Sequence, residues 1–272
     1  MESFIEYHSR SSGLYLKIDK LLYKKKSKYQ EILVFENEFF GRVLALDNLI
    51  MTTTRDEFIY HEMLVHIPLK SHPNPKKILI IGGGDGGTLR EVLKYPIEKA
   101  ILVEIDEEVI NVSKQFFPEL SISFNDKRAE IIIMDAIEWV KTSNEKFDVI
   151  LVDSTDPIGI AEGLIGEEFL RNLKNIMLEN SIVCIQSESP FYHLDILKDI
   201  YFKFKKLFSN AFVYTVPIPT YPGGYWSFTI SFNALKFPAI RNNYKVENVK
   251  FYNDEIYKSV FSLPTFLKEN LE

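Results

Sequence analysis

The strongest constraint on the fold is a series of five short, almost continuously apolar runs in the second part of the chain, with helix-like stretches between them. Runs of this kind are typical of strands that are buried on both faces of a parallel sheet. Their alternation with helices predicts an open α/β sheet built from βαβ units. The expected strands are residues 76–82, 99–105, 129–135, 147–153 and 181–188, and the expected helices include 86–95, 106–116, 166–178 and 193–208.

Two further strand-like runs, residues 211–219 and 225–233, are joined by a short loop that contains Tyr-Pro-Gly-Gly. A loop of this length permits an antiparallel hairpin but no parallel crossover. We therefore expect a Rossmann-like sheet of the methyltransferase type, which ends in an antiparallel hairpin. Residues 234–272 are mixed in character and end in a predicted surface helix.

The first part of the chain is typical of β structure, with short runs rich in Ile, Leu, Val and Tyr. A helical pattern follows, with Asp56 as its expected N-cap, and the stiff sequence His-Pro-Asn-Pro at 72–75 ends it. We place the domain boundary there, which gives an N-terminal β-strand domain with a closing helix (1–72) and a Rossmann-like catalytic domain (73–272). The strand-like runs are 14–26, 29–37 and 41–51.

Composition excludes several classes of protein. Of the 272 residues, 46% are apolar and 26% charged, and the formal net charge is −6. A moderately acidic chain is a poor candidate for nucleic-acid binding, which depends on basic patches. The chain shows no apolar run long enough for a membrane span and no signal-peptide pattern at its start. We expect a cytoplasmic protein without nucleic-acid or membrane partners.

A glycine-rich turn, Gly82-Gly-Gly-Asp-Gly-Gly87, directly follows the first of the buried strands and precedes a helix. Glycines at this place allow positive φ angles and a close approach of the backbone to a ligand. A dinucleotide pyrophosphate is the usual ligand of such a turn. Asp85 argues against phosphate, because it brings a negative charge to that place. A ligand with a cationic or neutral group fits better, although Asp85 alternatively serves as a helix cap.

Two more acidic residues end the next two strands. Glu104 lies 20 residues past Gly84, where an acid typically accepts hydrogen bonds from ribose hydroxyls. Asp135 is placed to accept a hydrogen bond from the amino group of an adenine. Each acid alone is compatible with a helix cap. Together with Asp85 they predict an adenosine pocket without phosphate, hence a nucleoside sulfonium such as S-adenosylmethionine or a relative.

The fourth strand ends in Asp153 and, three residues later, Asp156. The loop that follows is long and glycine-containing, so it is able to close over a substrate. The alternative for Asp156 is an Asx-turn before Pro157. Glu188 ends the fifth strand and is equally compatible with a site acid and with a rim residue.

Tyr60, His61 and Tyr221 lie near the predicted cleft, although His61 is also compatible with a surface position on its helix. We expect no metal site, because His61 and His66 are five positions apart and do not share a helix face. Cys184 lies in the middle of an apolar strand, so we expect it to fill the core.

The chain resembles the spermidine synthase family, the polyamine aminopropyltransferases, over nearly its whole length. The resemblance implies a small β domain before a Rossmann-like domain, in a homodimer or homotetramer. It also implies transfer of the aminopropyl group of decarboxylated S-adenosylmethionine to putrescine, giving spermidine and methylthioadenosine, with no metal or other cofactor. The matching segments are YQEILVFEN (29–37), TTTRDEFIYHEM (52–63), HPNPKKILIIGGGDGG (72–87), VEID (103–106), DSTDPIG (153–159) and IPTYPGG (218–224).

Matching motifs imply the roles of individual residues. Asp153 corresponds to the family's proton acceptor, with Tyr60 as a possible assistant. One departure is Ile160, which stands where many relatives have a proline, so the conformation of the loop 157–166 is left open. The expected donor residues are Gln30, Gly82, Gly84, Asp85, Glu104, Asp135 and Ala136, and the expected polyamine residues are Tyr60, His61, Asp85, Asp153, Ser154, Thr155, Asp156, Tyr221 and, from its position alone, Glu188.

The proposed chemistry explains why acids are needed. An aliphatic diamine has pKa values near the lysine value of about 10.4, so it arrives protonated, while only a neutral amine can attack. Asp153 takes or relays the proton. Asp85 pairs with the ammonium of the decarboxylated donor and repels the carboxylate of its parent. Three alternatives remain: another acceptor (cadaverine, agmatine, 1,3-diaminopropane or spermidine), a methyltransferase, or a non-catalytic polyamine sensor.

Overall fold

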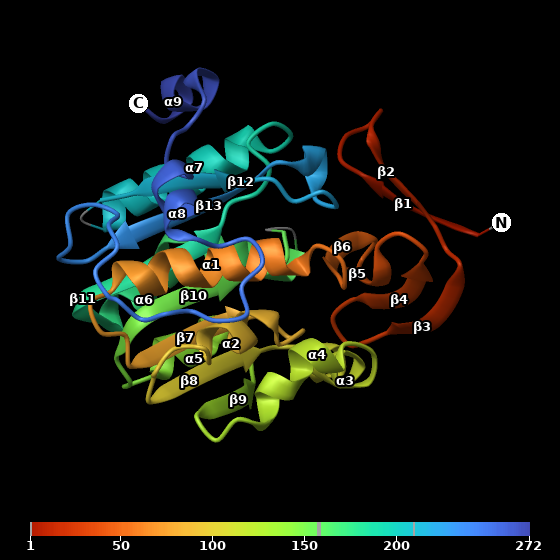
Figure 1. Ribbon diagram of the computed structural model, residues 1–272, viewed down its shortest axis with the longest axis horizontal. Helices are drawn as coiled ribbons and strands as arrows, with labels where there is room; N and C mark the ends of the chain where they lie inside the picture. Colours follow the sequence, from red (N-terminus) through yellow and green to blue (C-terminus); the bar gives the residue numbers. More distant parts are fainter. Residues whose placement is uncertain (1, 157–158, 209) are drawn as a thin grey trace.

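The computed structural model describes residues 2–156, 159–208 and 210–272, without the side chains of residues 159 and 160. A seven-stranded sheet forms the centre, and a four-stranded and a two-stranded sheet lie at one side of it (Figure 1). The strand order of the large sheet is β12-β13-β11-β10-β7-β8-β9.

The large sheet confirms the predicted fold class. Strands β7 to β11 run parallel to one another. Strand β13 pairs antiparallel with both β11 and β12. The predicted terminal hairpin is therefore present. The strands are β7 (Lys77–Gly82), β8 (Lys99–Glu104), β9 (Ala129–Ile133), β10 (Phe147–Asp153), β11 (Met177–Gln186), β12 (Phe212–Val216) and β13 (Trp226–Phe232).

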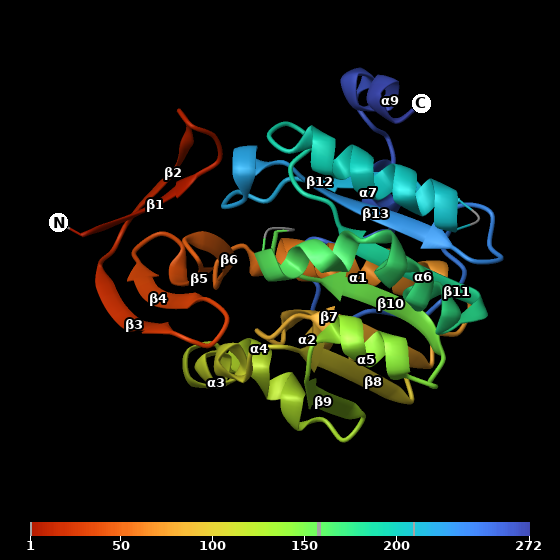
Figure 2. The same ribbon diagram turned by 180° about the vertical axis from the view of Figure 1, so that it is seen from behind.

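Helices cover both faces of this sheet. Alternate residues of β7 point to opposite faces: Ile78 and Ile80 pack with α1 and α2, and Leu79 and Ile81 pack in the core beneath α5, α6 and α7. Figure 1 views the first face and Figure 2 the second. The helices are α1 (Glu57–Ser71), α2 (Gly87–Val92), α3 (Glu107–Phe116), α4 (Pro118–Ser121), α5 (Ala136–Thr142), α6 (Glu167–Asn175), α7 (Leu194–Leu207), α8 (Asp254–Ser259) and α9 (Thr265–Leu271), with the short 3-10 helices η1 (Ile122–Asn125), η2 (Gly159–Ile165) and η3 (Pro222–Gly224).

The N-terminal part is β structure, as expected, but it forms two sheets. The predicted run 14–26 is divided, because β2 ends at Lys17 and β3 begins at Lys20 in another sheet. The hairpin of β1 and β2 packs against the four-stranded meander of β3 to β6 through Phe4 and Leu16 and projects beyond it (Figure 1). The strands are β1 (Ser3–Tyr7), β2 (Gly13–Lys17), β3 (Lys20–Lys26), β4 (Glu31–Asn37), β5 (Gly41–Leu46) and β6 (Leu49–Thr53).

Helix α1, which the sequence assigns to the N-terminal domain, packs on the large sheet. Ile59, Met63 and Ile67 are buried in the same core as residues of β7, β10 and β11. This packing favours a division of the chain before α1 rather than at residues 72–75. Asp56 stands at the N-cap position of α1, as expected, but its carboxylate makes no capping hydrogen bond. The carboxylate accepts from Thr53 Oγ1 at 2.6 Å and from the Thr220 amide at 3.0 Å, and so joins β6 to the loop before η3.

A C-terminal belt, residues 240–252, runs across the outer face of α1 (Figure 1). The buried carboxylate of Glu62 accepts hydrogen bonds from the backbone amides of Lys250, Phe251 and Tyr252 at 2.7 to 2.8 Å. Lys70 Nζ donates to two backbone carbonyls of the belt, at 3.0 and 3.1 Å. These bonds hold α1 between the belt and the sheet. The predicted terminal helix is α9.

None of the helices in the described part of the chain combines the length and the apolar character that a membrane crossing needs.

Candidate active site

A cavity opens where the carboxyl ends of β7, β8 and β10 meet the four-stranded sheet. It brings together residues that the sequence places in this region, including all predicted donor residues and most predicted amine residues. The predicted residues that line it are Gln30, Tyr60, His61, Gly82, Gly84, Asp85, Glu104, Asp135, Ala136, Asp153, Ser154, Thr155 and Tyr221. Parallel strands place their ends at one sheet edge, which is why residues so far apart in the chain converge here.

The glycine-rich turn joins two strand ends. Gly82 has a φ of 79°, and a Cβ there would lie 2.2 Å from the carbonyl oxygen of Asp153. The amide of Gly83 donates to the same carbonyl at 2.9 Å. Only glycine at position 82 permits this approach without strain. The turn therefore fixes Asp85 beside the end of β10.

Glu104 and Asp135, which the sequence analysis assigns to the nucleoside, both line the cavity. Glu104 is buried, which raises its pKa to about 7, and its Oε1 accepts from the Asp106 amide at 2.9 Å. Asp135 Oδ1 accepts from the Ile137 amide at 2.8 Å, so it does cap α5 while it also lines the cavity. For Asp135, a role as a helix cap is therefore compatible with a place in the cavity wall.

The N-terminal part of the chain also lines the cavity, through Gln30 just before β4. Gln30 Nε2 donates to Asp106 Oδ2 at 3.0 Å. Ser27 Oγ donates to the same oxygen at 2.6 Å. Asp106 thus connects the two parts of the chain. The sequence analysis did not single out this residue, although it ends the motif VEID.

Asp153 lines the cavity, and both of its carboxylate oxygens accept hydrogen bonds. Tyr60 OH donates to Oδ1 at 2.7 Å and Thr88 Oγ1 donates to Oδ2 at 2.6 Å. Burial and the charge of Asp85 raise the pKa of Asp153, while His61 and the two hydroxyl donors oppose this rise. Burial and Asp153 raise the pKa of Tyr60 well above its ordinary value, so Tyr60 remains a donor. Sequence reasoning missed Thr88, which directly follows the glycine motif.

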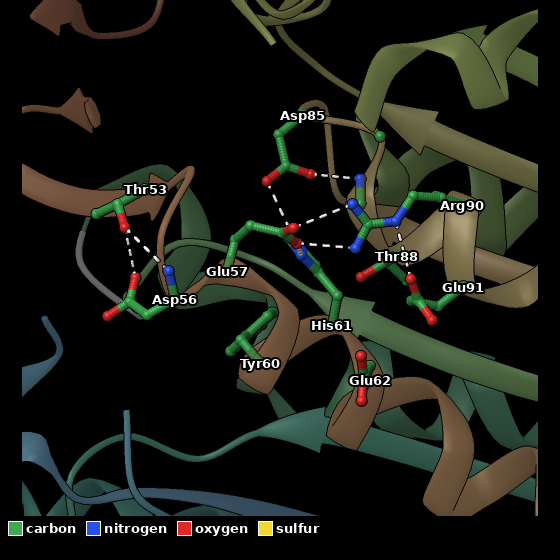
Figure 3. Close-up of polar contacts among 12 residues, drawn as sticks. Thr53, Asp56, Glu57, Tyr60, His61, Glu62, Asp85, Thr88, Arg90 and Glu91 are labelled. Atoms are coloured by element: carbon green, nitrogen blue, oxygen red, sulfur yellow. Dashed lines mark hydrogen bonds and ion pairs between the residues drawn. The ribbon is translucent and has the colours of Figure 1, made fainter. Parts of the chain in front are cut away.

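His61 is buried, so the alternative of a surface histidine is wrong. Its Nδ1 lies 2.6 Å from Glu57 Oε2, and its Nε2 lies 3.2 Å from Asp85 Oδ2 (Figure 3). Asp85 Oδ1 accepts from the Gly87 amide at 2.8 Å, so Asp85 also binds the first turn of α2. Sequence reasoning missed Glu57 and Arg90. Both lie within helices and not at the end of a buried strand, where the sequence analysis looked for site residues.

A smaller pocket adjoins the cavity beyond Tyr60 and Tyr221. Asp156 lines this pocket, whereas the predicted residue Glu188 lines neither space. Burial and the neighbouring carboxylate of Glu188 raise the pKa of Asp156 to about 8. Two neighbouring carboxylates do not readily carry their negative charges together, so the pKa of at least one of them rises. Residues common to the two spaces are Met51, Tyr60, Ser154, Thr155 and Tyr221.

Glu188 is completely buried, and the rim interpretation of this residue is wrong. It lies two residues past β11, has a φ of 66°, and its Oε2 is 2.9 Å from His193 Nδ1. Burial raises the pKa of Glu188 to about 7. Its contact with Asp156 places it behind the smaller pocket, as a support for the acid that lines it.

The N-terminal hairpin contributes an acid that sequence reasoning missed. Glu6 of β1 lines the smaller pocket, and its Oε2 accepts from the Ile50 amide at 2.7 Å. Burial, opposed by that hydrogen bond, raises the pKa of Glu6 to about 7, and Asp156 adds to the rise. No motif marks Glu6, because its place depends on how the hairpin folds over β6.

The loop 157–166 is described in part. Residues 157 and 158 and the side chain of Ile160 lie outside the described residues, so the question about Ile160 is unchanged. The later residues Ala161 and Leu164 line the cavity. Among the residues that the structure describes, no group of three or more His, Cys, Asp or Glu side chains is arranged to hold a metal ion.

Comparisons with known proteins agree with this geometry. A family model described as the spermine/spermidine synthase domain matches residues 57–240, and one described as the spermidine synthase tetramerisation domain matches residues 3–54. The chain belongs to the spermine/spermidine synthase family. The predicted resemblance is therefore confirmed.

Relatives with this family's activity match over their full length. The polyamine aminopropyltransferase of Caldicellulosiruptor saccharolyticus is 43% identical over 273 residues, which cover 99% of this chain and 98% of the relative. The polyamine aminopropyltransferase of Methanocaldococcus jannaschii is also 43% identical, and the match covers 98% of this chain and 94% of that relative. The predicted enzyme class, polyamine aminopropyltransferase, is confirmed.

Solved structures of the family have the same fold. A spermidine synthase in complex with the transition-state analogue AdoDATO superposes with a TM-score of 0.95 at 41% identity, covering 99% of this chain and 94% of that one. The spermidine synthase of Thermotoga maritima gives a TM-score of 0.92 at 40% identity, with the same coverage.

Proposed function

We propose that this aminopropyltransferase is a spermidine synthase, which moves the aminopropyl group of decarboxylated S-adenosylmethionine to putrescine. The products are spermidine and methylthioadenosine. The observation that carries the proposal is the position of Asp153, which lines the larger cavity and accepts hydrogen bonds from Thr88 and from Tyr60, a residue that also lines the smaller acidic pocket. A base at this place is within reach of an amine that extends from the smaller pocket into the cavity.

The donor binds in the larger cavity. Its ribose hydroxyls bind Glu104, its adenine lies near Asp135 and Ala136, and Gln30 covers the nucleoside from the four-stranded sheet. Its aminopropyl ammonium binds near Asp85. An ammonium beside a carboxylate forms a charge-assisted hydrogen bond. S-adenosylmethionine carries an additional carboxylate that Asp85 repels, so the decarboxylated donor is favoured.

The chemical step is a substitution at the carbon beside the sulfonium. The neutral amine nitrogen forms a new C–N bond to that carbon as the C–S bond breaks, and the sulfur leaves with the bonding pair as neutral methylthioadenosine. The surplus proton on nitrogen passes to Asp153. Because the sulfonium is already an activated leaving group, we propose a reaction without a metal or other cofactor.

The smaller pocket is proposed to hold the distal ammonium of the acceptor. Asp156 and Glu6 line it, and Tyr60 and Tyr221 lie between it and the base. A diamine held at its far end places its near nitrogen in line for attack. This arrangement supports a short aliphatic diamine with one charge at each end, for which putrescine is the proposed compound. The other amines remain alternatives for the same pocket.

The assembly is proposed to be a homodimer or homotetramer. The match of residues 3–54 to the tetramerisation-domain model supports an oligomer. Ile5, Tyr7 and Tyr15 are exposed on the N-terminal hairpin, where a second copy would cover them. Cytoplasmic location and the lack of a nucleic-acid partner remain predictions.

Mass spectrometry of products tests the proposal. The purified chain receives decarboxylated S-adenosylmethionine and an equimolar panel of putrescine, cadaverine, agmatine, 1,3-diaminopropane and spermidine. We expect spermidine and methylthioadenosine as the main products. A different aminopropylated amine would correct the acceptor alone. Methylation of an amine by S-adenosylmethionine, or no methylthioadenosine at all, would contradict the proposed function.

A further inference from the structure

The buried histidine of the site has a carboxylate at each of its two ring nitrogens. His61 Nδ1 lies 2.6 Å from Glu57 Oε2 and its Nε2 lies 3.2 Å from Asp85 Oδ2. A neutral imidazole has one N–H and one lone pair, so it would turn a lone pair toward one carboxylate. An imidazolium ion donates at both nitrogens. The geometry therefore fits the charged form of His61.

Glu57 is itself held in place by Arg90 of α2. The guanidinium of Arg90 binds both oxygens of Glu57, with NH1 to Oε1 at 3.0 Å and NH2 to Oε2 at 2.9 Å (Figure 3). Bidentate pairs of this type fix the position of a carboxylate as well as its charge. Glu57 is nearly buried and touches neither the cavity nor the smaller pocket. Its contact with the site passes through His61.

The backbone leaves the His61 ring little freedom. The ring lies against Gly87, where a Cβ would be 2.2 Å from the ring carbon Cε1. On its other side the ring of Tyr60 meets it edge-on, with centroids 5.4 Å apart. The groups that face His61 are Glu57 and Tyr60 from α1, Asp85 from the glycine turn, Asp153 at the end of β10 and, through Glu57, Arg90 of α2.

We propose that Glu57, anchored by Arg90, is a positioning residue that holds His61 as an imidazolium ion against Asp85, so that its positive charge keeps Asp153 available as the base. This inference rests on the role of Asp153 proposed above. The new roles belong to Glu57 and Arg90, which line neither the cavity nor the smaller pocket.

Charge explains how Glu57 acts on Asp153. Burial lowers the pKa of His61, but Asp85 and Glu57 raise it well above the ordinary value. The resulting cation lowers the pKa of Asp153, against the effects of burial and of Asp85. Without the charge of Glu57, the proton on His61 is less stable there. His61 then loses its charge more easily, and the pKa of Asp153 rises. A protonated Asp153 accepts no proton from the amine.

Histidine NMR of the full chain tests the first step without any substrate. The chain has five histidines, and His61 is assigned by the signal that His61→Asn removes. In the wild-type protein we expect the His61 signal to keep the imidazolium shift through the range in which an ordinary histidine, with a pKa of about 6.5, loses its proton. An ordinary titration of His61 in the wild-type protein overturns the proposal, whatever the variants do.

Two glutamate variants then isolate the charge of Glu57. In Glu57→Gln we expect the titration midpoint of His61 to fall by about one pH unit or more, which is the size of one charge contact at a partly buried site. Glu62→Gln is the control, because Glu62 is a buried acid of the same helix that binds the C-terminal belt and not His61. An equal shift in both variants, or none in Glu57→Gln, overturns the proposal.

The pH dependence of kcat/KM tests the second step. In Glu57→Gln we expect the acid limb of the profile to move to higher pH, with a loss of about tenfold for each pH unit of that shift at the acid end. We expect no such movement in Glu62→Gln. An unchanged limb despite a shifted His61 contradicts the link to Asp153. Absence of aminopropyl transfer in the wild-type protein would contradict the proposed function alone, because the NMR titration still decides what Glu57 does.

Discussion

Tyr60 donates a hydrogen bond of 2.7 Å to Asp153 from 93 positions earlier in the chain. The bond crosses from α1 to the end of β10, so it depends on the packing of α1 against the large sheet. It stabilises the ionised form of Asp153, as does the bond from Thr88 on the other oxygen. The two hydroxyl donors thus fix the orientation of the carboxylate and favour its ionised form, against the effect of burial.

Removal of the Tyr60 hydroxyl should weaken the base at low pH. Tyr60 lowers the pKa of Asp153, so Tyr60→Phe raises that pKa, and the base is lost at a higher pH than in the wild-type protein. We expect the acid limb of kcat/KM to move upward and the loss of activity to be about tenfold or less at alkaline pH, where Asp153 is ionised in both proteins. The measurement is kcat/KM against pH. A loss that is uniform across pH would assign Tyr60 to binding alone.

Replacement of the base itself should remove catalysis and spare binding. Asp153→Asn keeps the shape of the side chain but cannot accept the proton of the amine. We expect kcat to fall by about 10² to 10⁴, the usual range for a general base. Methylthioadenosine should still bind, with an affinity within a few-fold of the wild-type value in calorimetry. Turnover close to the wild-type rate would remove Asp153 from this role.

The donor preference depends on Asp85 in our proposal. Asp85→Asn removes the charge that attracts the donor ammonium and repels the carboxylate of S-adenosylmethionine. We expect weaker binding of the decarboxylated donor and a ratio of the two affinities closer to one. Calorimetric titration with both compounds gives the ratio. If Asp85→Asn leaves the ratio unchanged, discrimination lies elsewhere in the cavity.

The residues that the sequence could predict share one property: each stands at the end of a buried strand or within a contiguous motif. Glu104, Asp135 and Asp153 follow apolar runs whose parallel pairing brings their ends to one edge of the sheet. The sequence pattern fixes this arrangement before any side-chain contact is known. The fold class could be predicted for the same reason.

The residues that the sequence did not predict depend on contacts between distant elements. Glu6 reaches the smaller pocket only because the β1–β2 hairpin lies over β6. Asp56 looks like a helix cap in the sequence, but tertiary contact with Thr220 takes its carboxylate away from the helix. Glu57 acts through the buried His61, and nothing in a helical pattern distinguishes a buried acid from an exposed one.

The belt bonded to Glu62 should contribute to stability and not to chemistry. Glu62 accepts three backbone hydrogen bonds from residues 250–252 and is almost completely buried. In Glu62→Gln the amide nitrogen is a donor that faces other donors, so at least one backbone N–H loses its partner. An unsatisfied buried group costs about 1–3 kcal/mol, and more where the lost partner was charged. We expect a decrease of this size in the free energy of unfolding, measured by urea denaturation, with kcat at low temperature close to the wild-type value. The exposed Glu255→Gln is the matched control, and equal stability of the two variants would show that the belt does not depend on Glu62.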